Sequence, residues 1–185
     1  RNNYPHGEQG MLYHLLDYSG NDNGGMANIN ALCNRNNNAA YSDIASYYRD
    51  VPDFSWTIMV VTHETGHNLG ANHTHWCGWP GGPIDGCAPT FDPGYAEGNC
   101  DIGPIPSEGG TMMSYCHLLS VGVNFTQGFG PIPGDLIRNK VYNAACLEPC
   151  VDGCVNADSG QSISAPDNDI AYENDCLKGG EYFTL

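Results

Sequence analysis

HETGHNLGANH at residues 63–73 combines three histidines with one glutamate in a short stretch. Each residue of an α-helix turns the chain by about 100°, so His63 and His67 lie on one face, about one turn apart. Both imidazoles can therefore reach a single metal ion. Glu64 faces too far round the helix to join them and is better placed to hold a water on the metal. This pattern predicts a zinc site with Glu64 as the general base.

The third histidine requires a turn in the chain. In a continuous helix the His73 ring would lie about 9 Å beyond His67 along the axis and point away from the metal. Gly70 stands where a helix ends with positive φ, which glycine adopts at no steric cost, so the chain can bend and bring His73 back. Three protein ligands leave one coordination position open, as in catalytic zinc sites. The alternative is a helix whose histidines only pack or form hydrogen bonds.

A second motif, GTMMSY at residues 110–115, follows downstream. Together with the long zinc motif it resembles the metzincin metallopeptidases, which carry a methionine-containing turn beneath the metal. The resemblance implies that Met113 lies under the zinc. It also implies that Tyr115 binds zinc or stabilises the oxyanion, as a tyrosine does in astacin-like and serralysin-like members. Without the zinc motif, Met113 would be interpreted as an ordinary core methionine.

The resemblance also suggests substrate-binding residues. GGMANI at residues 24–29 is similar to the Gly-x-Ala edge strand of adamalysin-like (reprolysin) members, so Gly25 and Ala27 are expected to pair with an extended peptide. A Gly-Gly turn before any strand would look the same. Leu118 and Leu119, after the methionine turn, are expected to line the pocket for the residue that follows the scissile bond.

The chain combines sequence features of more than one metzincin subgroup. Thr74 follows the third histidine, where adamalysins have Asp, astacins Glu, matrixins Ser and serralysins Pro. The Gly-x-Ala strand and TIMVVT at residues 57–62 look most like reprolysins, whereas Tyr115 looks more astacin-like. The chain therefore resembles a divergent reprolysin-like secreted protease with an astacin-like Met-x-Tyr turn.

Charge excludes several classes of partner. Six Lys and Arg against 21 Asp and Glu give a net charge of −15, which argues against binding nucleic acid or an anionic membrane surface. No apolar run approaches the eighteen or so residues of a membrane span. Asp92, Glu97 and Asp101 offer oxygen ligands for calcium, although no complete EF-hand-type loop is present. Solubility of a secreted protein is the simpler explanation of the acidity.

Nine cysteines indicate an oxidising compartment and hence secretion. Two local disulfides are expected among the four cysteines of a Gly- and Pro-rich stretch: Cys77, Cys87, Cys100 and Cys116. Cys33 and Cys146 are candidates for joining the two ends of the catalytic unit. Cys150, Cys154 and Cys176 lie beyond it. The odd count leaves one thiol that is free, or that pairs with a missing segment or another chain.

The expected fold class is α+β. The metzincin resemblance implies a twisted mixed sheet, an active-site helix above the cleft and a loop-rich, disulfide-stapled lower subdomain with a C-terminal helix. The catalytic domain is assigned to residues 1–148, with an upper subdomain at 1–73 and a lower one at 74–148. Its N-terminal part is expected to be incomplete, and a pro-segment that makes the protein a zymogen is a family expectation. Residues 149–185 are predicted to be an extension or the start of another module.

Hydrophobic periodicity predicts the individual elements. They are strands over 11–16 and 26–32, a strand or short helix over 42–48, the zinc helix over 56–70 and a terminal helix over 135–147. Asp53 or Ser55 is expected to cap the zinc helix.

The function that best fits these features is a secreted zinc endopeptidase acting on proteins or peptides, with a water on the zinc activated by Glu64. Two alternatives remain: a zinc-bound, non-hydrolytic binding or adhesion module, and a zinc hydrolase of other amides or esters. An intact Glu64 argues against the first, and the edge strand argues against the second. The natural substrate, the cleavage preference and the oligomeric state do not follow from the sequence.

Overall fold

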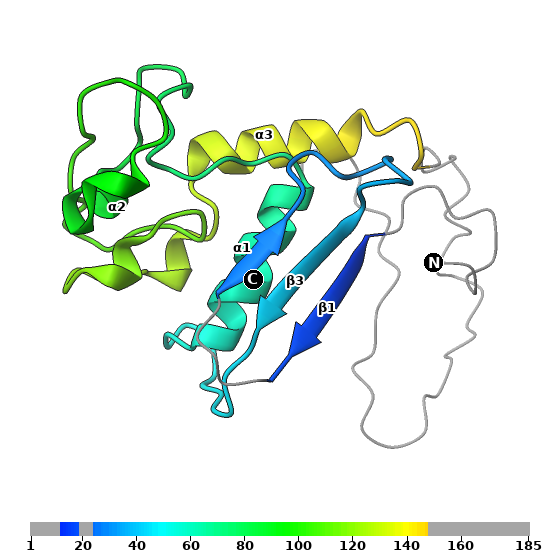
Figure 1. Cartoon of the computed structure of the whole chain (residues 1–185), viewed down its shortest axis with the longest axis horizontal. Helices are drawn as coiled ribbons and strands as arrows, with labels where there is room; N and C mark the ends of the chain where they lie inside the picture. Colours follow the sequence, from blue (N-terminus) through cyan, green and yellow to red (C-terminus); the bar gives the residue numbers. More distant parts are fainter. Residues whose placement is uncertain (1–11, 19–23, 148–185) are drawn as a thin grey trace, which may run out of the picture. The chain divides into compact units, whose positions relative to one another are not determined.

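The computed structural model describes residues 12–18 and 24–147 of the chain. Within them, a mixed sheet is formed by β1 (Tyr13–Asp17), β2 (Gly25–Ala27) and β3 (Ala39–Asp43) in the order β1-β3-β2 (Figure 1). β1 is parallel to the central β3, whereas β2 is antiparallel to it. The expected α+β class with a mixed sheet is confirmed, and β2 is an edge strand of this sheet.

β2 is shorter than the predicted strand over 26–32. It ends at Ala27 because the chain turns at Asn30, whose φ is 60°. The backbone N–H groups of Asn30 and Ala31 donate to the carbonyls of His67 and Asn68 at 2.9 and 2.7 Å. These carbonyls end the zinc helix and have no partner within it. The segment after β2 thus serves as a helix cap, which hydrophobicity alone does not reveal.

β1 and β3 also differ in their bounds from the predictions. β1 runs over 13–17 instead of 11–16, and residue 11 lies outside the described residues. β3 runs over 39–43, so the undecided element over 42–48 is wrong in its bounds. After β3 the chain passes the first turn of the zinc helix. There the Ala45 N–H donates to the Thr57 hydroxyl, which in turn donates to the Ala45 carbonyl.

Helix α1 (Trp56–Asn68) is the predicted zinc helix and packs against β3 and β2 (Figure 1). Ser55 is the N-cap residue, but its side chain makes no capping hydrogen bond. Instead, the Trp56 indole donates to the Asp43 carbonyl at 2.8 Å and ties the helix start to β3. At the other end, Gly70 has φ +103°, as the expected bend requires.

Two small apolar clusters pack on α1. Met59 contacts Met112 and Phe125 in one cluster, and Ala71, Met113 and Ile137 form the other. Ile137 belongs to α3 (Pro131–Tyr142), which starts four residues before the predicted 135–147 and ends five earlier. Proline is favoured in the first turn of a helix, where no N–H is needed, so the early start is compatible with Pro131.

Between α1 and α3 the chain is loop-rich, as expected. Its short elements are α2 (Cys87–Phe91), η1 (Pro93–Tyr95), η2 (Cys116–Leu118) and η3 (Phe125–Gln127). The structure forms the predicted disulfides and settles their pairing as Cys77–Cys100, Cys87–Cys116 and Cys33–Cys146.

Several sequence predictions fall outside the described residues. Cys150, Cys154 and Cys176 are among them, as is the proposed extension over 149–185. Within the described ranges, every helix is too short or too polar to cross a bilayer.

Candidate metal centre

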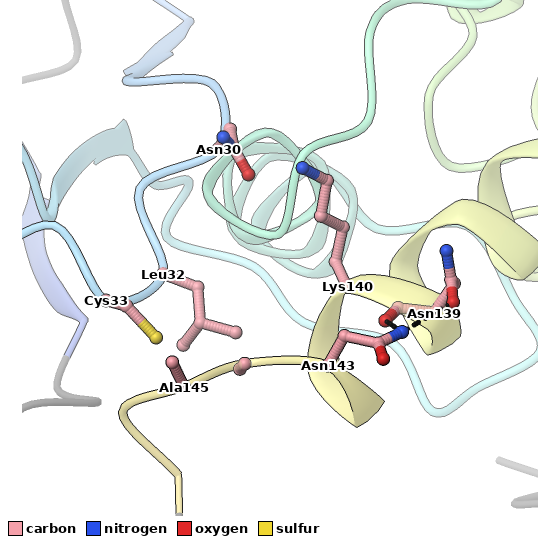
Figure 2. Close-up of a pocket in the computed structure, with 8 residues that line it drawn as sticks. Asn30, Leu32, Cys33, Asn139, Lys140, Asn143 and Ala145 are labelled. Atoms are coloured by element: carbon pink, nitrogen blue, oxygen red, sulfur yellow. Dashed lines mark hydrogen bonds between the residues drawn. The ribbon is translucent and has the colours of Figure 1, made fainter.

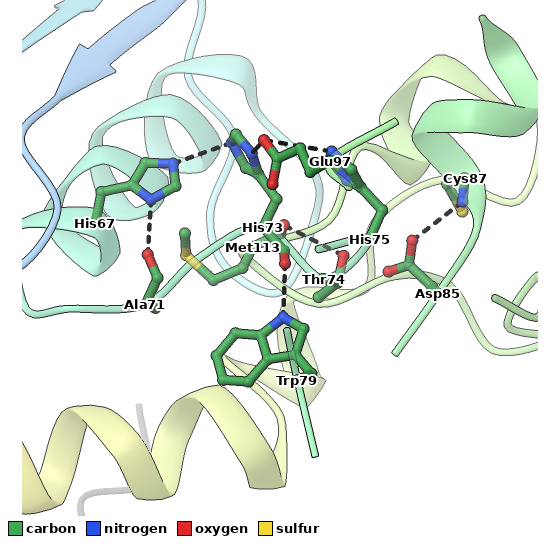
Figure 3. Close-up of polar contacts among 10 residues, drawn as sticks. All are labelled: His67, Ala71, His73, Thr74, His75, Trp79, Asp85, Cys87, Glu97 and Met113. Carbon is green, nitrogen blue, oxygen red and sulfur yellow. Dashed lines mark hydrogen bonds and ion pairs between the residues drawn. The ribbon is translucent and has the colours of Figure 1, made fainter. Parts of the chain in front are cut away.

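The structure brings the three histidines of the zinc motif together. His63 and His67 lie one turn apart on α1, and the bend at Gly70 returns His73 to them. The ligand nitrogens of the three rings all lie within 4.8 Å of one another. The Nε2 atoms of His67 and His73 are 3.0 Å apart (Figure 3). This is the arrangement that the spacing predicts.

Backbone carbonyls fix the orientation of the two helical histidines. Nδ1 of His63 lies 2.7 Å from the Met112 carbonyl, and Nδ1 of His67 lies 2.7 Å from the Ala71 carbonyl. Because a carbonyl oxygen only accepts, each Nδ1 is assigned the hydrogen, which leaves the Nε2 lone pair facing the centre. A neutral imidazole with a lone pair directed at the ion is the form that binds zinc.

Burial keeps these rings neutral. The pKa of His63 lies well below its ordinary value because the ring is buried and faces the other histidines. Burial, and then the nearby His73, lowers the pKa of His67 to about 4. Desolvation penalises the charged form of a histidine, so neither ring carries a proton that a metal would have to displace near neutral pH. The chemistry of this donor set fits zinc.

His73 differs from the other two because its partner is a side chain. Its Nδ1 lies 2.5 Å from Oε1 of Glu97, a residue that the sequence offered only as a calcium ligand (Figure 3). Among the described residues, neither Asp92 nor Asp101 belongs to any cluster of three metal-binding side chains, so calcium gains no support. The Asp92 carboxylate instead accepts from the Gly94 N–H at 2.8 Å.

Glu64 is buried beside the three histidines. Burial raises the pKa of its carboxyl group to about 7. The edge strand β2 passes directly against it, since a Cβ at Gly25 would overlap the Glu64 carboxylate. The close approach of backbone to carboxylate therefore needs a glycine at this position.

A cleft of about 320 Å³ opens beside Glu64. Gly24 and Gly25 of the edge-strand region line it, together with several residues of α1. The segment after the methionine turn contributes Tyr115, His117 and Leu118, and η1 contributes Tyr95. Leu119 and Ala27 are not among the lining residues. Ala27 is held in β2 opposite Ala40.

Both methionines of the downstream motif contact the segment that carries the histidines, Met113 by its side chain and Met112 by its carbonyl. Met113 is fully buried, and its sulfur would lie 2.5 Å from a Cβ at Gly66, between the two helical histidines. The Met113 carbonyl accepts a hydrogen bond from the Thr74 N–H at 3.1 Å. The Met112 carbonyl accepts one from Nδ1 of His63 at 2.7 Å. Thus the motif supports the centre through both side chain and backbone, and the role of Met112 was not predicted.

Tyr115 faces the centre. Its ring centroid lies 4.7 Å from that of His73 and 5.7 Å from that of His63. Burial, and then the charge of Glu64, raises the pKa of Tyr115 to about 12. The phenol therefore remains protonated at neutral pH and is able to donate a hydrogen bond.

A second pocket, of about 350 Å³, lies away from this centre, between the end of α3 and the segment after β2 (Figure 2). Its polar lining consists of Asn30, Asn139, Asn143 and Lys140. Cys33, which forms the disulfide with Cys146, also lines it. This lining contains no histidine or carboxylate. The candidate site residues His63, Glu64 and Tyr115 line the cleft beside Glu64 and not this pocket.

Comparison with known families gives an independent result. A reprolysin-type family model, described as Metallo-peptidase family M12, matches residues 2–124, which include every residue of the centre described above. A search of curated proteins found no match to the chain.

Proposed function

Because the chain belongs to the metallo-peptidase family M12, we propose that it is a secreted zinc endopeptidase in which His63, His67 and His73 hold the metal. The observation that carries this proposal is the convergence of three imidazole nitrogens beside a buried carboxylate in an open cleft. Three protein ligands leave a coordination position for water and substrate, as catalytic sites require.

Glu64 is the proposed general base. When bound, zinc lowers the pKa of a water molecule and polarises the substrate carbonyl. Glu64 accepts the proton of that water and returns it to the leaving amine. Its place suits both steps, since the buried Glu64 carboxylate lies beside His63 and lines the cleft. Tyr115 donates a hydrogen bond to the oxyanion of the tetrahedral intermediate.

The edge strand is the proposed peptide-binding element. β2 has a sheet partner on one side only within the described sheet, and Gly25 borders both the cleft and Glu64. An extended peptide can add to such an edge by main-chain hydrogen bonds, largely independently of its side chains. We propose that Gly25 and Ala27 pair with the substrate, and that Leu118, which lines the cleft, shapes the pocket beyond the scissile bond.

Secretion is supported by the three disulfides, since such bonds persist in oxidising compartments. We further propose a catalytic domain over 1–148 and a separate extension over 149–185. A pro-segment that keeps the enzyme inactive until it is removed also remains part of the proposal.

Cleavage of a quenched casein substrate tests the proposal. Wild-type protein should cleave casein, and removal of zinc with a chelator should abolish cleavage until zinc is restored. A Glu64→Gln variant should retain zinc but lose about 10²- to 10⁴-fold in kcat/KM, because the neutral amide cannot accept the proton. Zinc retention without cleavage by wild type would favour the binding module. Hydrolysis of small esters or amides but not of casein would favour the other class of hydrolase.

A further inference from the structure

We propose that Glu97 is a positioning residue whose carboxylate orients His73 as the third zinc ligand. This inference rests on the proposed zinc site and deepens it. Oε1 of Glu97 accepts a hydrogen bond from Nδ1 of His73 over 2.5 Å. That bond places the His73 hydrogen on Nδ1 and directs the Nε2 lone pair toward His67, 3.0 Å away.

His73 needs such a partner more than the other ligands do. His63 and His67 are held by the rigid helix α1 and by backbone carbonyls. His73 lies outside that helix, after the bend, and its side chain is 17% exposed. A hydrogen bond to a carboxylate fixes both the tautomer and the ring orientation, and it raises the basicity of the ligand nitrogen.

The distance favours a hydrogen bond over a second metal site, although the ligand atoms of His73, His75 and Glu97 all lie within 4.8 Å of one another. Two ligands of one tetrahedral zinc ion, each about 2.0–2.2 Å from it, lie roughly 3.3–3.6 Å apart. The His73–Glu97 separation of 2.5 Å is too short for a shared ion. The 3.0 Å between the Nε2 atoms of His67 and His73 is closer to that expectation.

His75 lies near the same oxygen of the Glu97 carboxylate (Figure 3). It is buried, and its Nε2 lies 3.7 Å from Oε1 of Glu97. The His75 and His73 rings stack with centroids 5.0 Å apart and planes inclined by 10°. Oε1 of Glu97 therefore lies near one nitrogen of each of two nearly parallel, stacked imidazoles, and His75 restricts the ring plane of His73.

The backbone around Glu97 is fixed by independent contacts. The Cys77 N–H donates to the Glu97 carbonyl at 3.0 Å, and Trp76 forms a β-bridge with Glu97. The Cys77–Cys100 disulfide closes the loop that carries Glu97. Gly98 has φ +111°, and a Cβ there would lie 2.8 Å from Cβ of Cys77. The loop is thus built against the segment just after His73.

Zinc affinity tests the role directly. The dissociation constant is measured by competition with a chromophoric chelator for wild type, Glu97→Gln and Glu97→Ala. Loss of a partner of this kind typically weakens metal binding by about 10- to 100-fold. We expect Glu97→Ala to lie in this range and Glu97→Gln, which keeps the size and an acceptor oxygen, to show a smaller loss. Glu108→Gln, the same change at an exposed acid, is the control and should bind zinc like wild type.

Spectra of the cobalt-substituted proteins provide a second measurement. The visible bands of Co²⁺ should shift in both Glu97 variants and not in Glu108→Gln, because the bands report ligand geometry. The comparison uses variants whose zinc-free forms keep the wild-type urea midpoint, and the nearly isosteric Glu97→Gln is chosen for that reason.

The results that would contradict the proposal distinguish a failure of the zinc site from a failure of the role of Glu97. If wild-type protein binds no zinc, the proposed function fails. If wild type binds one zinc and both Glu97 variants bind it equally tightly with unchanged cobalt spectra, only the role of Glu97 is overturned. Two zinc ions in wild type and one in Glu97→Gln would also overturn it, because His73, His75 and Glu97 would then form a metal site of their own.

Discussion

Gly25 is the residue at which the edge strand and the proposed base meet. A Cβ at this position would overlap the carboxylate of Glu64, so Gly25→Ala must displace either Glu64 or β2. A catalytic group misplaced by about 1 Å can lose about a hundredfold in rate. We therefore expect a loss of this order in kcat/KM for casein, with zinc affinity unchanged. Leu15→Ala is the control, since Leu15 is 64% exposed and lies in β1 at the opposite edge of the sheet, and it should behave like wild type. Full activity of Gly25→Ala would contradict this view of the cleft.

The protonation of His67 predicts how stability depends on pH. Its pKa is lowered from 6.5 to about 4 in the folded, zinc-free protein, mainly by burial. Between these values the unfolded chain binds more protons at this position than the folded one, so the contribution of His67 to stability falls as pH falls. Glu64, whose pKa is raised by burial, acts in the opposite direction over an overlapping range.

The difference between two proteins isolates the effect of His67. Urea unfolding of chelator-treated wild type and of His67→Gln should give free energies whose difference, wild type minus variant, decreases from pH 6.5 to pH 4. Glu64 is present in both proteins, so its contribution largely cancels. A difference that stays constant over this range would contradict the lowered pKa.

At the scale of elements, α1 and the methionine turn pack so closely that α1 needs a glycine. A Cβ at Gly66 would lie 2.5 Å from the Met113 sulfur and 2.7 Å from the Phe129 ring. An alanine normally favours a helix by up to about 1 kcal/mol over glycine, but overpacking costs about 1–3 kcal/mol. We therefore expect Gly66→Ala to lower the free energy of unfolding.

Gly134 of α3 is the matched control. An alanine there meets only the flexible end of Arg138, at 3.4 Å. Gly134→Ala should therefore leave the free energy of unfolding unchanged or raise it by up to about 1 kcal/mol. Urea unfolding of both variants compares the two helices, and equal effects would argue against close packing of Met113 beneath α1.

The helices and strands differ in how far the sequence predicts them. α1 is predicted nearly to its ends, because its histidine spacing and its glycine bend are both local signals. β2 is overestimated since the apolar residues after Ala27 do not extend the strand, and the backbone of Asn30 and Ala31 instead caps α1. α3 starts four residues before the predicted helix because the prediction relied on apolar spacing alone, whereas the first turn of a helix also accepts a proline such as Pro131. The error at β2 thus comes from a contact between segments distant in sequence.

The residues of the candidate site also differ in how far the sequence predicts them. His63, Glu64, His67 and His73 are brought together as their spacing predicts. Glu97 could not be assigned in this way, because it lies 24 positions after His73, beyond a loop-rich stretch that also contains α2 and η1. Its nearness to Cys100 was a signal, but the sequence does not pair the cysteines. The contribution of the Met112 carbonyl carries no side-chain signature at all.

At the scale of the whole molecule, two disulfides are expected to affect different properties. One mainly raises the free energy of unfolding, and the other mainly raises zinc affinity. Cys33–Cys146 spans 113 residues, and Cys77–Cys100 spans 23 residues around Glu97. Loop-closure entropy assigns about 5 kcal/mol to the first and about 3 kcal/mol to the second. Replacing both cysteines of a pair by serine should therefore lower the free energy of unfolding more for Cys33–Cys146.

Zinc affinity should follow the opposite order. Only the Cys77–Cys100 loop carries the carboxylate that contacts His73, so its removal lets Glu97 move away from the ring. Urea unfolding gives the stability of each double variant, and chelator competition under conditions where both are folded gives the zinc dissociation constant. A larger loss of zinc affinity in the Cys33→Ser/Cys146→Ser protein would show that the ends of the unit, and not the Glu97 loop, hold the third ligand in place.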